Sequence, residues 1–334
     1  MIQTLEIQNF KSIRHLRIDC RRVNVFIGEP NTGKSNILES LGIFSAPFTG
    51  DFGDFVRMEE MTDLFYNHNL RDEITIRAGQ SSFHLRFNER EGTSKGEMEL
   101  ETFIGAEAVP YNFDFTDRRV SIFPVLSPHN PHKFYRFSPT SQFRRIPASF
   151  LLPPYGENLP YLLLVNPELR KSLGDLFAPF NLRLVVGYRG DQLSVQKEVG
   201  EVIVSLPYTI VSDTLRRIAF YLAAMETNQE SVLILEEPES HAFPYYTKYL
   251  AERIALDDSN QYFISTHNPY LLIPLLEKTP AEELAVFVTY FREDQTMVRP
   301  IAGKEELEKV LDLDLADIFF NLHLLVDKES WSST

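Results

Sequence analysis

The chain of 334 residues is 43% hydrophobic and 24% charged, which is ordinary for a globular protein of one large or two medium domains. Its formal charge of −14 at pH 7 excludes a chain that coats nucleic acid by bulk electrostatics, although a local basic groove stays open as an alternative. The single Cys20 excludes an intrachain disulfide and fits a reducing compartment. Residues 1–10 are polar and alternating, and no apolar run approaches the ~18 residues of a membrane span, so we expect a cytoplasmic protein without a signal peptide or a membrane partner.

The first third of the chain contains several short strand patterns and one helical pattern. Residues 2–8 and 13–18 predict strands joined by a short connector. Residues 23–27 are nearly all apolar, which is typical of a central strand covered on both faces, and a helical pattern follows over 36–44. The other elements expected here are a partly helical segment at 54–68, strands at 73–78, 82–88 and 97–104, and a tight hairpin turn at 89–95.

A phosphate-binding loop pattern, Gly-x-x-x-x-Gly-Lys-Ser, lies between the central strand and its helix. Gly28 and Gly33 let the backbone curl so that its N–H groups, and the positive end of the helix, face a phosphate chain. Lys34 would reach the β- and γ-phosphates, and the Ser35 hydroxyl would bind Mg²⁺. The pattern therefore predicts that the chain binds a nucleoside triphosphate. The expected nucleotide-binding residues are Gly28, Glu29, Pro30, Asn31, Thr32, Gly33, Lys34, Ser35 and Asn36.

Residues 121–160 carry eight prolines. Because each proline removes a backbone donor, we expect an irregular arm or lobe boundary here, kept from disorder by its many aromatic residues. Beyond it we expect a helix at 167–177, strands at 182–186, 193–197 and 202–206, and a long helix at 212–225 with Leu215, Ile218, Ala219 and Leu222 on one face.

Two later strand patterns end in polar residues. Residues 232–235 are apolar and lead into Glu236 and Glu237, at the sheet edge where ligands of α/β proteins bind. We assign Glu236 to the Mg²⁺ shell and Glu237 to orienting or deprotonating the attacking water. Residues 261–264 form a second apolar run that leads to His267, whose imidazole would donate a hydrogen bond to a γ-phosphate oxygen.

Four segments together resemble the ABC-type ATPases of the SMC/RecF branch, and within it small AAA-type ATPases related to the OLD (overcoming lysogenization defect) family. Residues 5–13 resemble the first strand and its "nFks" turn, and residues 28–36 match "GxPNxGKSN". Residues 235–241 resemble the acidic "EEPEaH" motif, and residues 264–269 the "isTHnP" motif of the switch histidine. The resemblance covers about 1–45 and 210–275, and nothing matches between about 90 and 205.

The resemblance implies an α/β P-loop NTPase of the ABC/SMC/RecF type: a mixed central sheet with an antiparallel β portion, and a smaller, partly helical second lobe. We expect one domain over 1–334, with lobe I at about 1–120 and 231–325 and lobe II at about 121–230. It also implies MgATP hydrolysis at the interface of a head-to-tail homodimer. Ser212, at the start of the signature helix, would face the γ-phosphate held by the second subunit.

The chain departs from the family pattern in three places. The signature segment after Ser212 lacks the family's glycines, and no glutamine lies between Ser35 and Gln80 to serve as the Q-loop residue. Asn67 and Asn69 are candidates for that role. Glu236 stands where many relatives have aspartate, which lengthens the arm to the metal by one methylene group.

Three roles compete for the ATPase. The first is a nucleotide-gated switch that recruits a separately encoded effector protein, as in some phage-defence systems of this family. The second is a DNA repair or end-processing ATPase, for which the basic, aromatic-rich stretch at 113–150 would bind single strands. The third is an OLD-like nuclease, which needs a TOPRIM domain. Asp312 and Asp314 resemble its acidic pair but lie in a helical pattern, so we interpret them as a solvated helix face.

Two other classes of protein with the same phosphate loop fit the sequence less well. A GTPase needs the guanine-binding pattern Asn-Lys-x-Asp, which this sequence lacks. Small-molecule kinases lack the paired acids followed by a strand and a histidine, which this sequence has.

Overall fold

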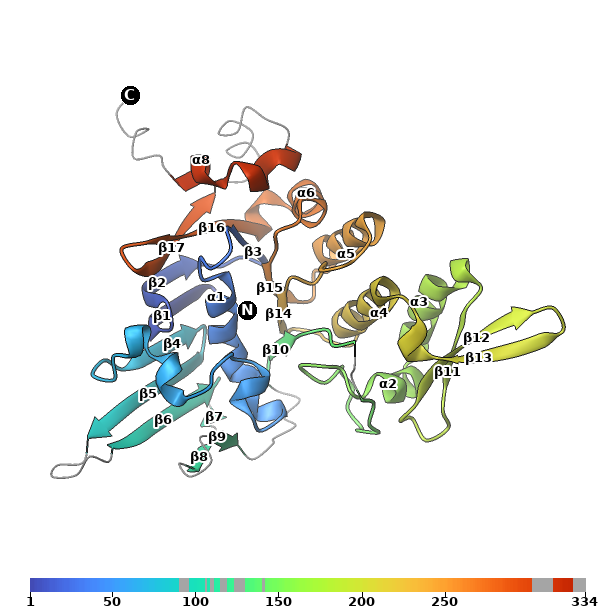
Figure 1. Ribbon diagram of the computed structural model, residues 1–334, viewed down its shortest axis with the longest axis horizontal. Helices are drawn as coiled ribbons and strands as arrows, with labels where there is room; N and C mark the ends of the chain where they lie inside the picture. Colours follow the sequence, from blue (N-terminus) through green and yellow to red (C-terminus); the bar gives the residue numbers. More distant parts are fainter. Residues whose placement is uncertain are drawn as a thin grey trace.

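The structure is a computed structural model, and it describes residues 1–89, 96–105, 107–108, 111–114, 119–122, 130–139, 142–301 and 315–326 (Figure 1). Residues 90–95 of the expected hairpin turn, and Asp312 and Asp314, lie outside these ranges.

The central sheet has six strands in the order β10-β14-β15-β3-β16-β17. Its neighbours pair in parallel except β16 and β17, which form an antiparallel hairpin at one edge. The strands are β3 (Val23–Gly28), β10 (His132–Tyr135), β14 (Val232–Glu236), β15 (Gln261–Ser265), β16 (Leu284–Arg292) and β17 (Gln295–Ile301). The runs predicted to be buried strands at 23–27, 232–235 and 261–264 therefore lie side by side in the middle of the sheet.

Both faces of this sheet are covered, which explains why its strands are apolar without alternation. Val25 and Ile27 pack into one core cluster with helices α4 (Asp213–Glu226), α5 (Pro244–Leu256) and α6 (Pro269–Lys278). Phe26 points to the opposite face and packs into a second cluster with helix α1 (Lys34–Gly42) and the antiparallel sheet. Figure 1 shows α1 on one side of β14 and β15, and α4 to α6 on the other.

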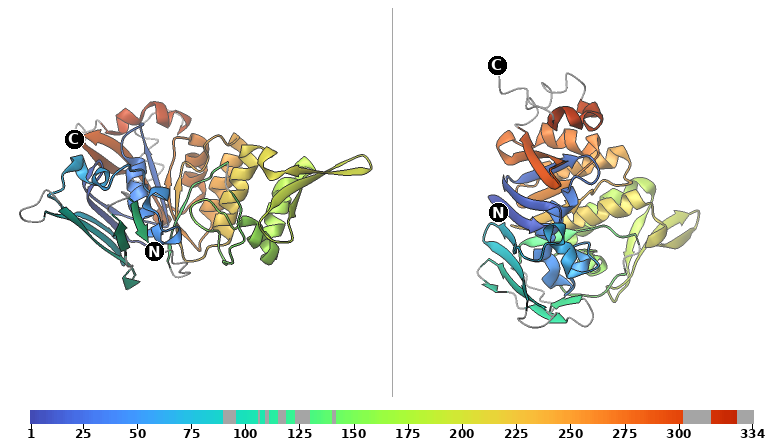
Figure 2. Two further views of the ribbon diagram at one scale, coloured as in Figure 1. Left: turned by 60° about the horizontal axis from the view of Figure 1, so that its bottom comes forward. Right: turned by 60° about the vertical axis from the view of Figure 1, so that its left-hand side comes forward.

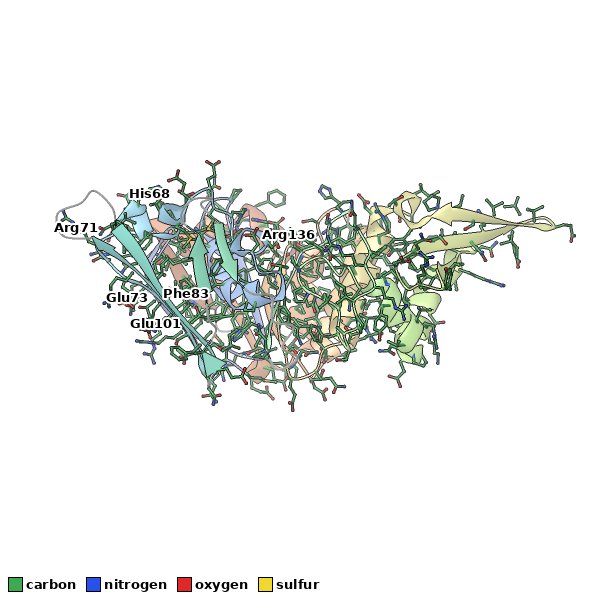
Figure 3. The ribbon with its side chains drawn as sticks, turned by 90° about the horizontal axis from the view of Figure 1, so that it is seen from below. His68, Arg71, Glu73, Phe83, Glu101 and Arg136 are labelled. Carbon is green, nitrogen blue, oxygen red and sulfur yellow. The ribbon has the colours of Figure 1, made fainter. Side chains whose placement is uncertain are left out.

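The antiparallel sheet has the order β2-β1-β4-β5-β6-β7, and the expected strands at 2–8, 13–18, 73–78, 82–88 and 97–104 all belong to it. Its inner side chains, such as Phe83 of β5, are buried, and Figure 3 shows Phe83 and Glu101 on neighbouring strands of the sheet. The strands are β1 (Thr4–Phe10), β2 (Ile13–Asp19), β4 (Ile74–Ala78), β5 (Ser81–Glu89), β6 (Gly96–Ile104) and β7 (Glu107–Ala108). Four short 3₁₀ helices, η1 (Ile43–Phe48), η2 (Phe52–Asp54), η3 (Met61–Leu64) and η4 (Tyr66–His68), and the pair β8 (Tyr111–Asp114) and β9 (Arg119–Ile122) complete this part.

A separate arm extends away from the central sheet beyond α4 (Figure 2). Its three-stranded sheet, β11-β12-β13, matches the strands expected between 182 and 206, and α3 has the predicted bounds. The elements of the arm are α2 (Leu159–Val165), α3 (Pro167–Phe177), η5 (Ala178–Phe180), β11 (Arg183–Val186), β12 (Leu193–Val199), β13 (Val202–Pro207) and η6 (Tyr208–Ile210). Three short elements, η7 (Ala281–Glu283), η8 (Leu315–Phe320) and α8 (Leu322–Val326), lie near the C-terminal end of the described chain.

The prediction of an irregular segment over 121–160 is wrong for one stretch, and a helix that was not predicted begins at the end of this segment. Residues 132–135 form β10, because this proline-free run buries Phe134 and Tyr135 and pairs in parallel with β14 at the sheet edge. Residues 159–165 form α2, because Pro160 lies in the first turn, where its missing N–H has no helical partner to lose. The proposed second lobe therefore contributes one strand to the central sheet.

We predict that Phe26→Ala lowers the free energy of unfolding by about 3–5 kcal/mol, because it leaves a cavity among large rings. The Phe26 ring centroid lies 5.1 Å from that of Phe287 and 6.5 Å from that of Phe263. Urea denaturation followed by circular dichroism measures the loss. Tyr188→Ala is the control, since this side chain is 86% exposed and its removal should change stability by less than about 0.5 kcal/mol. Equal losses in both variants would contradict the assigned core.

Candidate functional site

The loop between β3 and α1 is shaped to surround an anion. Gly33 has φ of 93°, and a Cβ there would lie 2.0 Å from the Thr296 hydroxyl oxygen, so only glycine fits. Gly33 is also the N-cap of α1 and offers no side-chain oxygen, which leaves the first N–H groups of the helix to an outside acceptor. Both features are those required of a phosphate-binding loop.

Lys34 bends over this loop. Its ammonium nitrogen donates hydrogen bonds to the carbonyl oxygens of Gly28 at 2.9 Å and Glu29 at 2.7 Å. Burial lowers the pKa of Lys34 to about 8, while the charge of Glu237 acts in the opposite direction. A buried cation that is met by two carbonyl oxygens and a nearby carboxylate is suited to receive a polyanion.

The parallel register brings the strand ends together at one edge of the sheet. Glu236 of β14 pairs with Ser265 of β15, and Ser265 pairs with Phe26 of β3. Beyond the paired residues, the Glu237 backbone N–H donates to the Ser265 carbonyl oxygen at 3.1 Å, and Glu237 takes a left-handed φ of 42°. The acidic segment, the histidine segment and the phosphate loop are therefore neighbours, as the sequence predicted.

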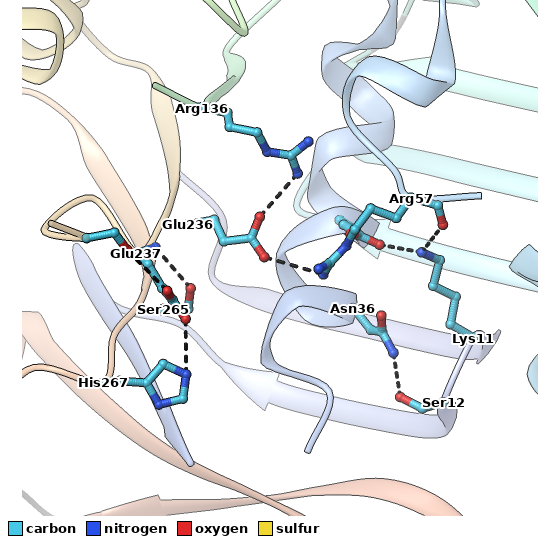
Figure 4. Close-up of polar contacts among 11 residues, drawn as sticks. Lys11, Ser12, Asn36, Arg57, Arg136, Glu236, Glu237, Ser265 and His267 are labelled. Atoms are coloured by element: carbon cyan, nitrogen blue, oxygen red, sulfur yellow. Dashed lines mark hydrogen bonds and ion pairs between the residues drawn. The ribbon is translucent and has the colours of Figure 1, made fainter. Parts of the chain in front are cut away.

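Glu237 and His267 face one another, with 3.0 Å between His267 Nε2 and Glu237 Oε1 (Figure 4). The Ser240 hydroxyl donates a second hydrogen bond to the Glu237 carboxylate, at 3.2 Å. The hydrogen bond from His267 and the imidazole's charge when protonated hold the pKa of Glu237 below its usual range, so the carboxylate is ionised at neutral pH. Both side chains remain partly open to solvent, at 42% and 38% exposure, which leaves them accessible to water and a ligand.

Glu236 is paired with Arg57 and with Arg136, which the sequence placed only in the basic stretch at 113–150. Arg136 contacts one carboxylate oxygen at 3.1 Å, and Arg57 contacts the other at 3.4 Å. Arg57 also binds Glu39, a fully buried carboxylate of α1 whose second partner is Lys11. No sequence pattern connects Arg57 to the site, because it lies in an irregular segment and becomes part of the site only through the tertiary fold.

Ser12 and Asn36 connect the first turn of the antiparallel sheet to the loop helix. The Asn36 amide donates to the Ser12 hydroxyl at 2.6 Å, and Ser12 also contacts the Thr296 hydroxyl at 2.7 Å. A cavity of about 740 Å³ opens beside Ser12, Arg57 and Asn67. Asn67 lines this cavity, whereas the Asn69 amide donates a hydrogen bond to Asp72 at 2.7 Å.

Ser212 is the N-cap of α4, and its hydroxyl accepts the Leu215 N–H at 3.4 Å. The predicted apolar face of this helix is buried in the core. None of the described contacts within one chain joins Ser212 to the phosphate loop. The role of Ser212 in the site of a second subunit therefore stays a prediction.

Glu239 lies behind the pair formed by Glu237 and His267. It is 4% exposed, and its carboxylate accepts a hydrogen bond from the Thr266 hydroxyl. Burial raises the pKa of Glu239 to about 7. In the sequence, Glu239 stands out only as part of the acidic motif at 235–241.

Among the described residues, no three or more histidine, cysteine, aspartate or glutamate side chains cluster closely enough to form a metal site by themselves. The oxygen donors of Ser35 and Glu236 nevertheless suit Mg²⁺, which takes only one or two protein ligands when it is bound together with phosphates. In the part of the chain that the structure covers, no helix has the length and apolar character needed to cross a membrane.

Comparison with protein families finds two matches. Residues 1–91 match the model described as "AAA ATPase domain", and residues 190–273 match "AAA domain, putative AbiEii toxin, Type IV TA system". These segments contain the phosphate loop and the two later strand ends, respectively.

Two of the solved structures that resemble this chain align with most of its length. An SMC head bound to the C-terminal winged-helix domain of ScpA aligns with a TM-score of 0.58 and 13% identity, over 92% of this chain and 99% of that one. The SMC head from Pyrococcus furiosus, bound to the C-terminal domain of ScpA, aligns with a TM-score of 0.52 and 11% identity, over 93% and 98%. The predicted fold class is therefore confirmed: the chain has the fold of an SMC head.

Two curated relatives match shorter segments. An uncharacterized protein of Methanocaldococcus jannaschii is 30% identical over 91 residues, which cover 23% of this chain and 41% of that protein. An ATP/GTP phosphatase of Helicobacter pylori is 35% identical over 88 residues, which cover 23% and 24%. The matches thus span less than half of either relative. The two AAA ATPase family matches and the phosphate loop support a P-loop ATPase, and the solved structures show that it has the fold of an SMC head. The relation to the OLD family stays a prediction.

We predict that Glu239→Gln becomes progressively more stable than the wild type as pH rises. The folded-state pKa of about 7 lies above the ordinary 4.5, so the native state binds the proton more tightly, and wild-type stability falls between about pH 4.5 and 7. Glutamine does not titrate, so the difference in unfolding free energy should grow by about 3 kcal/mol across this window. Urea denaturation at pH 5 and pH 8 measures it. A difference that is independent of pH would contradict the raised pKa of the buried Glu239 carboxyl group.

Proposed function

We propose that the chain hydrolyses MgATP at a site completed by a second copy of itself, and that this cycle switches its contacts with a partner protein. The observation that carries the proposal is the contact between Glu237 and His267, 3.0 Å apart at the strand ends next to the phosphate loop. A carboxylate with a lowered pKa, held by an imidazole, is suited to orient and deprotonate an attacking water.

The other residues have defined roles in this proposal. The N–H groups of residues 28–36 and the Lys34 ammonium would bind the phosphates, and the nucleoside would extend into the cavity beside Ser12. Ser35 and Glu236 would hold Mg²⁺, which supplies charge neutralisation for the phosphates. His267 would donate a hydrogen bond to the terminal phosphate.

The second copy would contribute Ser212 and the N-terminus of α4, which are exposed on the single chain. An ATP molecule that contacts both subunits stabilises the dimer, and its hydrolysis removes this stabilisation. Binding and release of ATP would in this way become a change in subunit arrangement that a partner can detect.

A protein partner is supported by two observations on similar proteins. The SMC heads of similar fold are bound to domains of ScpA, and the second family description mentions a toxin and a toxin–antitoxin system. Both fit a switch that controls an effector, as in phage defence.

DNA repair or end processing is the second candidate. The described basic residues at 113–150 support it poorly, because Lys133 is buried against Ser231 and Phe150, and Arg136 is paired with Glu236. An OLD-like nuclease has no described acidic site to support it.

We predict that Glu237→Gln binds ATP but hydrolyses it about 10²–10⁴-fold more slowly, because the general base is lost. Size-exclusion chromatography with ATP and Mg²⁺ should then show a stable dimer. Lys34→Ala should lose about 100-fold in ATP affinity and stay monomeric, since charge-assisted hydrogen bonds are worth roughly 1.5–3 kcal/mol each. Glu282→Gln and Lys278→Ala, at exposed positions outside the site, are the matched controls. Wild-type turnover in Glu237→Gln would overturn its assignment.

We expect double-stranded or single-stranded DNA to change the ATPase rate by less than about twofold, because the basic side chains above are used inside the protein. The rate measured at low salt with both DNA forms tests this. Strong stimulation that disappears at high salt would favour the repair function instead.

A further inference from the structure

The loop that carries His267 is fixed from below by Thr266. The Thr266 side chain is fully buried, and its hydroxyl donates to Glu239 while accepting the Asn268 N–H at 3.0 Å. The Thr266 backbone N–H donates to the Phe26 carbonyl oxygen at 3.1 Å. Thr266, directly before His267, is thus fastened to the loop after β14 and to β3, and Asn268, directly after it, is fastened to Thr266.

Glu239, in the turn after β14, accepts the hydrogen bond from the Thr266 hydroxyl, which lies just after β15. Its backbone carbonyl oxygen accepts the Ala242 N–H at 2.8 Å, which holds the turn after β14 in shape. The His267 backbone N–H faces the same carboxylate and lowers its pKa, against the larger effect of burial. Glu239 therefore meets two consecutive residues of the histidine loop through one carboxyl group.

His267 itself has little to hold it. Its imidazole is 38% exposed, and the side-chain contact that the structure gives it is the one with Glu237. A partly exposed histidine just beyond the end of a strand, with one described polar contact for its ring, depends strongly on its backbone for its position. A shift of about 1 Å in such a group is enough to cost about 100-fold in rate.

We propose that Glu239 is a positioning residue that acts through Thr266 to hold the His267 imidazole against Glu237. This inference rests on the proposed function of that pair, and it assigns to Glu239 no contact with the nucleotide. This role also explains why a carboxyl group is buried here, although burying an apolar side chain would carry a smaller desolvation penalty.

The second carboxylate oxygen of Glu239, Oε2, has no hydrogen-bond partner and is buried. A neutral group of the same shape can therefore replace the carboxylate without losing its contact with Thr266. Glutamine retains an accepting oxygen, whereas methionine has similar length and no strong acceptor. At Thr266, serine keeps the hydroxyl, and valine keeps the shape but loses it.

The test is a kinetic comparison of four variants of the full chain, with the ATP affinity measured separately by binding of a fluorescent ATP analogue. Glu239→Met and Thr266→Val should lower kcat about 10–100-fold, with affinity and KM within about threefold of wild type. Glu239→Gln and Thr266→Ser should keep kcat within about threefold. The double variant Glu239→Met/Thr266→Val should be no slower than the worse single variant, because both break one contact.

Several outcomes would overturn the inference: wild-type kcat in Thr266→Val, equal losses in the serine and valine variants, or multiplying losses in the double variant. Thermal denaturation checks folding, and if Glu239→Met does not fold, the comparison of valine with serine at position 266 decides. The proposed function fails separately, if Lys34→Ala and Glu237→Gln turn over as wild type. If those two are inactive while Thr266→Val is fully active, only the role of Glu239 is refuted.

Discussion

The site depends above all on the parallel register of β14, β15 and β3. This register places Glu236, Ser265 and Phe26 in one row across the sheet, so the residues that follow each strand emerge at the same edge. A slip of one residue would turn the side chains of a strand to the opposite face. The register is fixed because alternate residues of β3 enter two different cores, with Val25 on one side and Phe26 on the other.

The second constraint on the site at this edge of the central sheet is the pairing of its charged side chains. Lys34 donates to loop carbonyl oxygens, Glu237 is held by His267, and Glu236 lies between Arg57 and Arg136. Each charge that the proposed chemistry uses already has a partner inside the chain, which offsets the cost of holding charges in a partly buried site. A triphosphate and its metal would exchange some of these partners.

The sequence predicted the parts of the site that follow local rules. The glycine loop, the two acidic residues and His267 each follow an apolar strand, and this order alone places them at one sheet edge. The strands of the antiparallel sheet alternate between buried and exposed residues, so their positions could also be predicted. Helix α4 followed from its apolar face and its N-cap Ser212.

Other parts depend on contacts that are distant in sequence, and no local pattern indicates them. Residues 132–135 become a strand only because β14 offers a free edge, and their surrounding prolines indicated the opposite. Arg57 and Arg136 meet Glu236 across 179 and 100 residues of chain. Glu239 stood inside a quoted motif, yet its contact with Thr266 appears only once the two strand ends lie side by side.

The most direct measurement is a crystal structure of the Glu237→Gln protein grown with ATP and Mg²⁺. We expect a triphosphate across residues 28–35, with its terminal phosphate within hydrogen-bonding distance of both Lys34 and His267. A nucleotide bound elsewhere, or a terminal phosphate that His267 does not reach, would contradict it.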